Sequence, residues 1–279
     1  MTAVEDLLRG LEKLPPLPET AVKLGEAAQD RYATSEEIEA VIKYDQVVTA
    51  SVLRVANSSF YATARPVGSL KEAVLRLGSN MLFRIAMSGT LRTIVSADIR
   101  GYGIAAGEFW RHSVATGISA QTIQQRINGE TDATTFTVGL LHDVGKVVMS
   151  QQLAERYDEL FTHGGLPSMP FFKIEKEEFG FDHAEVGSAL AEHWRLPADV
   201  AVAIRAHHSP SAETPPLVDI VHVADVLSLW MGTGIGTRGI QLSASGDALD
   251  RCGLSSEKLE SCACEAFLEL KRVEGIFEA

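Results

Sequence analysis

Hydrophobic residues recur with helical spacing along almost the whole chain. Val4, Leu7, Leu8 and Leu11 follow the i, i+3, i+4, i+7 rule of an amphipathic helix, and residues 256–277 repeat that pattern near the C-terminus. No stretch alternates apolar and polar residues between turn signals, as a half-buried strand would. The pattern therefore predicts an all-α fold.

Local signals indicate where individual helices begin and end. Residues 14–18, Leu-Pro-Pro-Leu-Pro, stop the first helix because proline cannot continue it. Gly78 and Gly129 follow apolar-periodic runs and are expected to cap helix C-termini. A capping residue stands three positions before an acid, a typical helix start, in the pairs Thr34–Glu37, Ser69–Glu72 and Asp182–Glu185.

Two glycine-containing interruptions predict the domain organisation. One lies at residues 98–104, between two long helical patterns, and the other at residues 232–246, which are rich in Gly, Ser and Thr. We therefore expect an N-terminal helical lobe over residues 1–100 and a second helical lobe over 101–231. Residues 232–279 would form a surface loop and a final helix.

The loop at residues 232–246 contains a string that matches the dinucleotide-binding fingerprint. Its glycines are Gly234, Gly236 and Gly239. That fingerprint requires a strand before it and a helix after it, whereas here a helical pattern precedes it and a polar loop follows. We interpret the string as plain loop and expect no dinucleotide cofactor.

Net charge, apolar runs and cysteine count indicate which partners and which cellular compartment to expect. The 279 residues carry a formal net charge of −12, which disfavours binding to nucleic acid or to an anionic membrane surface. No apolar run approaches the ~18 residues of a membrane span, and the N-terminus lacks a signal-peptide pattern. We expect a cytoplasmic protein with reduced thiols, because three cysteines do not make a disulfide framework: Cys252, Cys262 and Cys264.

Histidines and carboxylates recur at spacings that suit a metal site. Glu108 and His112 stand four residues apart and share one helical face. His142 and Asp143 have apolar flanks, which predicts a buried helix that carries both, with Lys146 on the side of Asp143. Burying an imidazole and a carboxylate without partners costs several kcal/mol, so both should be paired or metal-bound.

A second set of polar residues lies further along the chain. His207 and His208 come just before Ser-Pro, where a helix must end. Adjacent helical residues point about 100° apart, so both reach one site only if it is wide or holds two metals. Asp225 stands alone in an apolar segment, and His222, three residues earlier, is a reserve ligand candidate. Any one of these residues taken singly is more often an ordinary hydrogen-bonded core residue or a surface pair, but so many of them, several in apolar helices, favour a shared site.

A family resemblance strengthens the metal hypothesis. Residues 139–146, Gly-Leu-Leu-His-Asp-Val-Gly-Lys, resemble the signature of the HD metal-dependent phosphohydrolase superfamily. The preceding half of the chain resembles one branch, the HDOD domain of bacterial signalling proteins. That resemblance is carried by residues 14–18, 52–61, 69–78, 194–197 and 207–208. It implies a two-lobed helical fold with an HD-type core in the C-terminal lobe, acting as a regulatory output module.

The ligand set follows from a related enzyme branch, the HD-GYP cyclic-di-GMP phosphodiesterases. Its metal ligands are matched in order by Glu108, His112, His142, Asp143, His183, His207, His208 and Asp225. The Gly-Tyr-Pro segment after the double His is absent, so cyclic-di-GMP is not carried over as the substrate. Imidazoles and carboxylates without thiolates suit two divalent ions of iron, manganese or zinc. Asp143 would bridge them and Lys146 would hold a phosphate oxygen.

Three functions remain open at this stage. The first is a bacterial signal-transduction output module with a dinuclear metal site and a protein partner or nucleotide ligand. The second is a metal-dependent phosphohydrolase or phosphodiesterase that cleaves a nucleotide phosphoester, with Asp143 and Lys146 as catalytic residues. The third is a metal-free helical scaffold. In all three we expect Asn57, Ser58 and Tyr61 to be a fold or partner feature, because no reactive residue is near them in sequence.

Overall fold

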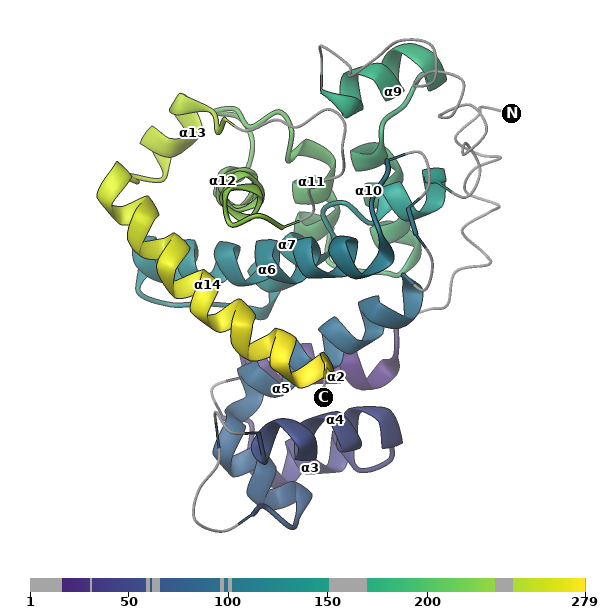
Figure 1. Ribbon diagram of the computed structural model, residues 1–279, viewed down its shortest axis with the longest axis vertical. Helices are drawn as coiled ribbons and strands as arrows, with labels where there is room; N and C mark the ends of the chain where they lie inside the picture. The colour runs from purple at the N-terminus through teal and green to yellow at the C-terminus, as the bar shows by residue number, and fades with distance from the viewer. Residues whose placement is uncertain are drawn as a thin grey trace.

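The all-α prediction is confirmed. The structure, a computed structural model, describes residues 17–30, 32–58, 61, 66–95, 98–99, 102–150, 170–233 and 243–278. Within these residues the only extended pairing is a single antiparallel bridge between Ile99 and Ile104. The helices gather into a lower and an upper lobe (Figure 1). None of the described helices combines the length and apolar character that a membrane crossing needs.

The lower lobe packs three short helices against one long one. Its core includes Leu24, Ile42, Val52 and Leu82, which have no exposed surface. Burying a side chain of this size contributes ~1.5–3 kcal/mol, so the apolar periodicity of the sequence drives this assembly. The helices are α2 (Glu19–Gln29), α3 (Ser35–Ile42), α4 (Gln46–Ala56) and α5 (Leu70–Ile94).

Helix α5 connects the two lobes. It begins as expected, because the Ser69 side chain accepts a hydrogen bond from the backbone N–H of Glu72. Gly78, where a helix end was expected, interrupts α5: its φ of 74° and ψ of 163° are non-helical and make a kink, beyond which a second helical segment follows directly. Glycine permits this conformation because it has no Cβ. The second half of α5 then reaches α6 and α7 of the upper lobe.

Asn57 has a structural task in the lower lobe. Its Nδ2 donates to the carbonyl oxygens of Leu53 and Val67, each at 3.0 Å. The backbone N–H of Val67 donates to Asn57 Oδ1 at 2.7 Å. The side chain thus ties the end of α4 to the segment that leads into α5, which fits the expected fold role.

The helices of the upper lobe pack around one long helix, α6. Helix α6 runs across the middle of Figure 1 and contacts α7 and α12, the latter seen end-on. The helices of this lobe are α6 (Ala106–Asn128), α7 (Ala133–Leu141), α9 (Phe171–Phe179), α10 (His183–His193), α11 (Ala198–Ala206), α12 (Pro216–Trp230) and α13 (Gly246–Arg251).

Glycine allows α6 and α7 to touch backbone to backbone. A Cβ added to Gly139 would lie 2.7 Å from the Cα of Gly117, closer than side-chain carbons approach. The two helices therefore approach more closely than any larger residue would allow. This contact brings the segment that carries His112 against the end of the helix that precedes His142.

Several helix ends follow the local signals in the sequence. Thr34 and Asp182 each form a complete capping box with the acid three residues later. Gly129 ends α6 in the left-handed conformation, with φ 74° and ψ 0°. The helix expected at residues 4–11 and the glycine string at 234–239 lie outside the described residues.

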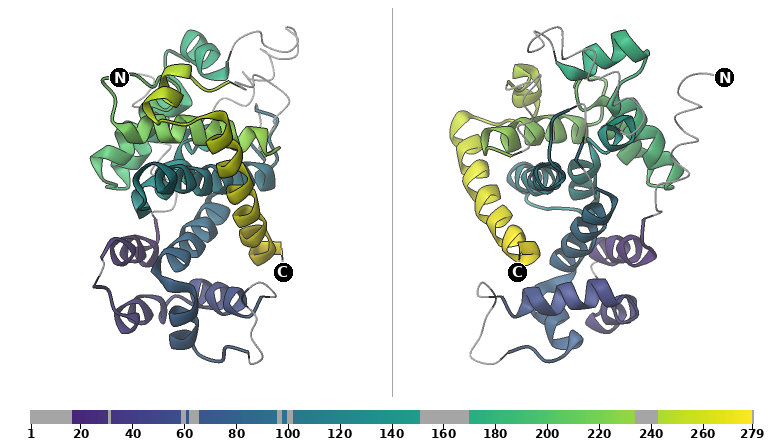
Figure 2. Two further views of the ribbon diagram at one scale, coloured as in Figure 1. Left: turned by 90° about the vertical axis from the view of Figure 1, so that its left-hand side faces the viewer. Right: turned by 45° about the vertical axis from the view of Figure 1, so that its right-hand side comes forward.

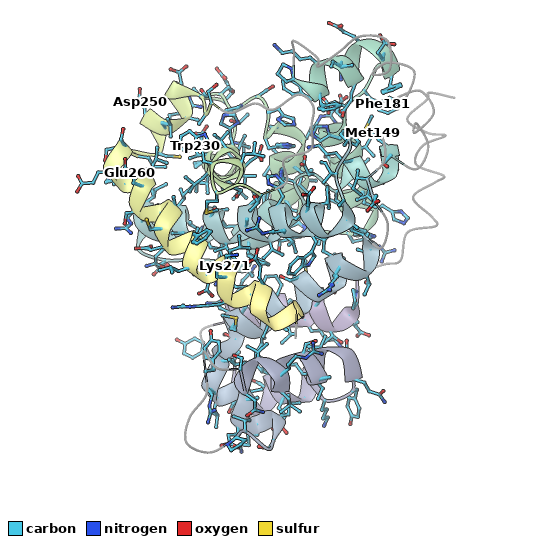
Figure 3. The ribbon with its side chains drawn as sticks, in the orientation of Figure 1. Met149, Phe181, Trp230, Asp250, Glu260 and Lys271 are labelled. Atoms are coloured by element: carbon cyan, nitrogen blue, oxygen red, sulfur yellow. The ribbon has the colours of Figure 1, made fainter. Side chains whose placement is uncertain are left out.

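Helix α14 (Ser256–Glu278) spans the two lobes. It descends from Glu260, beside the upper lobe, to Lys271 near the junction (Figure 3), and the C-terminal end of α14 stays close to that junction in both views of Figure 2. Arg84 of α5 donates to Glu269 of α14 at 3.1 Å and to Gln121 of α6 at 2.7 Å. One largely buried guanidinium thus joins three helices from both lobes.

Candidate metal centre

His142 and Asp143 lie in a turn, which corrects the expectation of a buried helix at these residues. Helix α7 ends at Leu141, residues 142–144 form the turn, and residues 145–150 are helical again. His142 has no exposed surface and Asp143 is 3% exposed. The apolar flanks in the sequence report burial correctly, but a buried turn and a buried helix have the same flanks.

Gly145 sets the approach of this turn to α10. A Cβ at Gly145 would lie 2.0 Å from the carbonyl oxygen of His183 and 2.8 Å from the backbone nitrogen of Gly187. Any side chain at this position would push α10 away. The glycine of the His-Asp-x-Gly-Lys string therefore allows Asp143 and His183 to meet.

The structure brings seven of the eight expected ligand residues into two adjoining groups. Within each group one candidate ligand atom from every residue lies within 4.8 Å of the others. The first group is Asp143, His183, His207 and His208, and the second group is His112, His142 and Asp225. These residues come from five different segments, so the fold and not local spacing assembles them.

Asp143 faces both groups, one carboxylate oxygen to each. Its Oδ1 lies 3.1 Å from His183 Nε2 and 3.9 Å from His207 Nε2. Its Oδ2 lies 3.5 Å from His142 Nε2 and 3.9 Å from His112 Nε2. This is the arrangement that a carboxylate needs in order to bridge two ions.

The second group is closed by Asp225. Its Oδ1 lies 3.1 Å from His112 Nε2 and 3.6 Å from His142 Nε2. The side chain of Asp225 is 16% exposed, whereas those of His112 and His142 are 6% and 0% exposed. Asp225 therefore forms part of the side of the site that solvent reaches.

Four of the imidazole rings are held through Nδ1, which leaves Nε2 facing the site. Nδ1 of His142 donates to the carbonyl oxygen of Gly139 at 2.8 Å, and Nδ1 of His207 donates to that of Ile204 at 2.7 Å. Because these acceptors cannot donate, Nδ1 of each ring carries a proton, and Nε2 is the nitrogen left to face the site. The acceptors for the other two rings are Glu175 for His183 and Thr233 for His112.

Buried atoms without hydrogen bonds test whether a metal fits. His142 Nε2, His207 Nε2 and Asp143 Oδ1 are buried and accept no hydrogen bond within the described residues. The Nε2 atoms of His183 and His208 lie only 2.8 Å apart, a distance that requires a cation or a proton between two lone pairs. Buried acceptors without hydrogen bonds, distributed over both groups, fit divalent cations, and this nitrogen and oxygen set suits iron, manganese or zinc.

Electrostatics keeps His207 and His208 neutral, as metal ligands must be. Burial lowers the pKa of His207, and the neighbouring His142 lowers it further, to about 3. Burial, followed by His207, also holds the pKa of His208 well below its usual value. His183 behaves differently: burial acts to lower its pKa, but the Glu175 carboxylate and a hydrogen bond with Asp143 together raise that pKa to about 9.

Lys146 lies on the same side as Asp143, as the sequence spacing predicted. Its Nζ donates to Asp143 Oδ2 at 2.5 Å, and its side chain is 16% exposed. Burial acts to raise the pKa of Asp143, but Lys146 and then His142 hold that pKa well below its usual range. Lys146 thus keeps the bridging carboxylate ionised and places a positive charge beside it.

Two candidates from the sequence do not join the site. Glu108 is exposed and belongs to neither group, although it stands one turn before His112. His222 uses both ring nitrogens elsewhere: Nδ1 donates to the carbonyl oxygen of His207 at 2.8 Å, and Nε2 accepts from the backbone N–H of Ser245 at 3.0 Å. His222 therefore supports the backbone of a ligand residue and has no nitrogen left for a metal.

Sequence reasoning missed the residues that orient the ligands. Glu175 has no exposed surface and accepts from the His183 ring, yet it stands in a helix with two other acids and nothing in the sequence distinguishes it. Thr233 Oγ1 lies 3.3 Å from His112 Nδ1. Phe172 stacks on His208, with ring centroids 4.4 Å apart and planes at 10°.

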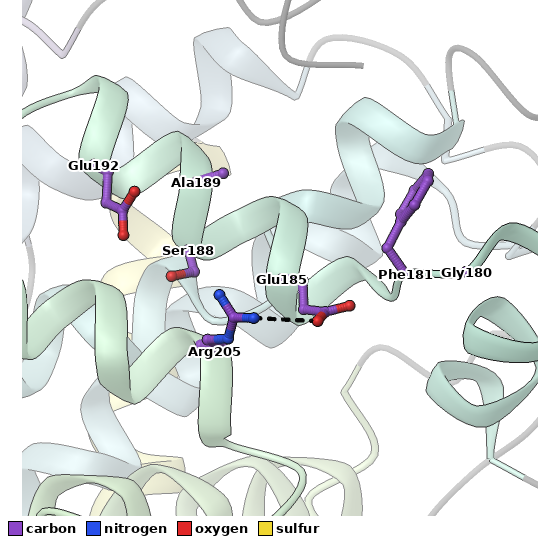
Figure 4. Close-up of a pocket in the computed structure, with 7 residues that line it drawn as sticks. All are labelled: Gly180, Phe181, Glu185, Ser188, Ala189, Glu192 and Arg205. Carbon is purple, nitrogen blue, oxygen red and sulfur yellow. Dashed lines mark hydrogen bonds and ion pairs between the residues drawn. The ribbon is translucent and has the colours of Figure 1, made fainter. Parts of the chain in front are cut away.

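Two surface hollows lie outside the metal groups. A hollow of about 160 Å³ lies beside α10 and α11, where Arg205 and Glu185 form an ion pair at 3.3 Å (Figure 4). A larger hollow of about 250 Å³ lies between the lobes and is lined by residues that include Phe83 and Trp194. Neither is lined by a residue of the first or second group.

Comparison with solved structures shows the same fold. An HDOD domain protein of unknown function from Geobacter sulfurreducens superposes with a TM-score of 0.75 at 24% identity, over 97% of both chains. A provisionally named signal transduction protein from Marinobacter aquaeolei gives 0.74 at 24% identity, over 99% of this chain and 66% of its own. A provisionally named phosphohydrolase from Shewanella amazonensis gives 0.70 at 22% identity, over 97% of both.

Sequence comparison identifies the family. An uncharacterized protein of Treponema pallidum is 26% identical over 224 residues, which cover 77% of this chain and 42% of that protein, so the chain spans less than half the length of this relative. The family model of the HDOD domain matches residues 14–210, well over half of the chain. With the helical fold and the clustered His and Asp residues, this match shows that the chain belongs to the HDOD domain family.

Proposed function

We propose that this protein is a bacterial signal-transduction output module of the HDOD family whose HD-type lobe holds two divalent metal ions. The observation that carries the metal part is the position of Asp143, with one oxygen toward each group of ligands. The signalling part is supported by the family and by the provisional name of the Marinobacter aquaeolei structure.

Each group would hold one ion. Nε2 atoms of His183, His207 and His208 would bind in the first group, and those of His112 and His142, together with Asp225, in the second. Asp143 would be shared. Such ions would supply concentrated positive charge and an activated water when bound. The output would then be a contact with a protein partner or a nucleotide that depends on the loaded site.

Metal content tests the proposal. We expect about two divalent ions per chain in protein purified without chelators, measured by inductively coupled plasma mass spectrometry. Asp143→Ala should lose both, because it removes the shared ligand. Glu108→Gln is the matched control, since Glu108 is an exposed acid outside both groups. Folded parent protein that reproducibly binds no divalent ion would overturn the proposal.

A nucleotide panel tests the output. Isothermal titration of metal-loaded protein with nucleoside mono-, di- and cyclic phosphates should show binding that Asp143→Ala abolishes if a nucleotide is the signal. Absence of binding to every nucleotide would leave a protein contact as the output. The two forms of the proposal are thereby separated.

Hydrolysis of a nucleotide phosphoester is a second candidate function, favoured by Lys146. Its Nζ stands 2.5 Å from the bridging carboxylate, in the partly exposed side of the site with Asp225. A lysine there can hold a non-bridging phosphate oxygen as a point charge. The test compares iron- or manganese-loaded parent with Asp143→Ala on nucleotide phosphoesters. Equal rates on every substrate would reject this candidate and leave the signalling module.

A further inference from the structure

We propose that Glu175 and Tyr102 form a positioning pair that sets the metal affinity of the first group by holding His183. The inference rests on the proposed metal centre and adds two residues to it. Glu175 lies in α9, and Tyr102 lies in the connector between α5 and α6. Neither residue belongs to the ligand groups.

The contacts of Glu175 fix both its own position and that of His183. Its Oε2 accepts from the backbone N–H of His183 and from His183 Nδ1, each at 2.7 Å. Its Oε1 accepts from the Tyr102 hydroxyl, also at 2.7 Å. A carboxylate without exposed surface is tolerated only when hydrogen bonds compensate its lost hydration, and these bonds do so.

His183 needs an external partner because of its place in its helix. His142 and His207 each donate to a carbonyl oxygen three residues earlier, which the last turn of the preceding helix provides. His183 is the first residue of α10, so no preceding helical turn offers it a carbonyl oxygen. A full negative charge on Glu175 also makes the opposite nitrogen of the ring a stronger donor to a metal than a carbonyl would.

Tyr102 extends this support to the connector between the lobes. It is 1% exposed and lies beside the bridge that joins Ile99 to Ile104. The Nζ of Lys146 lies 5.7 Å from the centroid of the Tyr102 ring. Both oxygens of Asp143 therefore contact residues that lie against the pair. Oδ1 faces His183, which donates to Glu175, and Oδ2 accepts from Lys146, which lies over the Tyr102 ring.

The test is metal titration of variants by competition with a chromophoric chelator. Glu175→Gln keeps the volume but removes the charge, and should weaken one of the two binding steps by about 10–100-fold, the usual effect of losing a partner that orients a ligand. Tyr102→Phe should weaken the same step less. The double variant should resemble Glu175→Gln alone, because Tyr102 acts through Glu175. Glu178→Gln is the control, since Glu178 is an exposed acid on the same helix.

A second readout separates positioning from general stability. In ¹H–¹⁵N spectra of the imidazole nitrogens, zinc-loaded parent should show a protonated His183 Nδ1 that exchanges slowly with water. Glu175→Gln should speed that exchange while far-ultraviolet circular dichroism stays unchanged. If Glu175→Gln does not fold, the metal titration and the proton-exchange measurement are both made on Tyr102→Phe, which removes one hydroxyl only.

The outcomes distinguish the two proposals. Parent protein that binds no ion would contradict the proposed function and this inference with it. Parent protein that binds two ions, with Glu175→Gln and Tyr102→Phe matching it in affinity and in the His183 signal, would overturn only the positioning pair.

Discussion

Gly145 packs so tightly against His183 that a Cβ on the glycine would lie 2.0 Å from the carbonyl oxygen of the histidine. That oxygen belongs to backbone and cannot move aside without shifting α10. The contact holds the turn with Asp143 against the start of α10. The shape of the site thus depends on the absence of a side chain at Gly145 as well as on the ligand residues.

Gly145→Ala should therefore damage both stability and the site. Overpacking of this kind costs about 1–3 kcal/mol or more, and the first group should lose metal because α10 is displaced. Urea unfolding and metal analysis measure the two effects. Gly107→Ala is the control, since a Cβ there meets nothing within 4 Å. Parent-like stability and metal content in Gly145→Ala would show that α10 adjusts freely.

The metal-free protein should be most stable near pH 6.5. Burial, then His142, lowers the pKa of His207 to about 3, so its neutral form stabilises the fold above the unfolded pKa near 6.5 and that contribution is lost as pH falls toward 3. Despite burial, Glu175 raises the pKa of His183 to about 9, so its contribution is present below pH 6.5 and is lost as pH rises toward 9.

The free energy of unfolding should fall by roughly 2 kcal/mol when the pH is moved 1.5 units from the optimum, both on the acid limb of the curve and on its alkaline limb. This follows from 1.36 kcal/mol for each unit of pKa difference. Denaturant midpoints of chelator-treated protein between pH 5 and 8 measure the curve. His207→Gln should make the acid limb shallower, since His208 also contributes to that limb, and should leave the alkaline limb unchanged. A parent curve that is level from pH 5 to 6.5 would show that His207 is not held neutral.

Helix α14 should contribute unequally through two of the acids that it pairs with arginines of other helices. Glu269→Gln leaves Arg84 largely buried without its charged partner and should cost about 2–3 kcal/mol. Glu265→Gln breaks the Arg126 pair, in which Glu265 is 57% exposed, and should cost about 0–1 kcal/mol. Thermal or urea unfolding compares them. Equal losses would mean that burial of the Arg84 pair has no energetic consequence.

Asn57→Ala should lower stability without changing metal content. The variant removes the hydrogen bonds that join Asn57 to Leu53 and Val67, and each is worth about 0.5–1.5 kcal/mol. Asn80→Ala, at an exposed position in α5, is the control. Loss of metal from a folded Asn57→Ala protein would place this residue in the functional machinery instead.

Local rules in the sequence predicted the helices because their causes are local. The Thr34 and Asp182 capping boxes and the left-handed Gly129 each depend on a few neighbouring residues. The ligand residues could also be predicted from the sequence, because polar groups in apolar segments need partners. Gly78 shows the limit of this reasoning: the positive φ was foreseeable, but whether the chain stops or kinks depends on what the next turn packs against.

The rest of the site depends on contacts between distant segments. The i, i+4 spacing puts Glu108 on the face of His112 but does not say which side chain points inward. Glu175 resembles its exposed neighbours in sequence and differs only in being opposite His183. Likewise, Tyr102 reaches Glu175 across 73 positions, and no periodicity links the two.

Anomalous diffraction from crystals of manganese- or zinc-loaded protein tests the central claim most directly. The account predicts two peaks, one beside the first group and one beside the second, each about 2.0–2.2 Å from Nε2 atoms, with the Asp143 carboxylate between them. A single peak, a peak at Glu108, or no peak at the Nε2 atoms of His142 and His207 would contradict it.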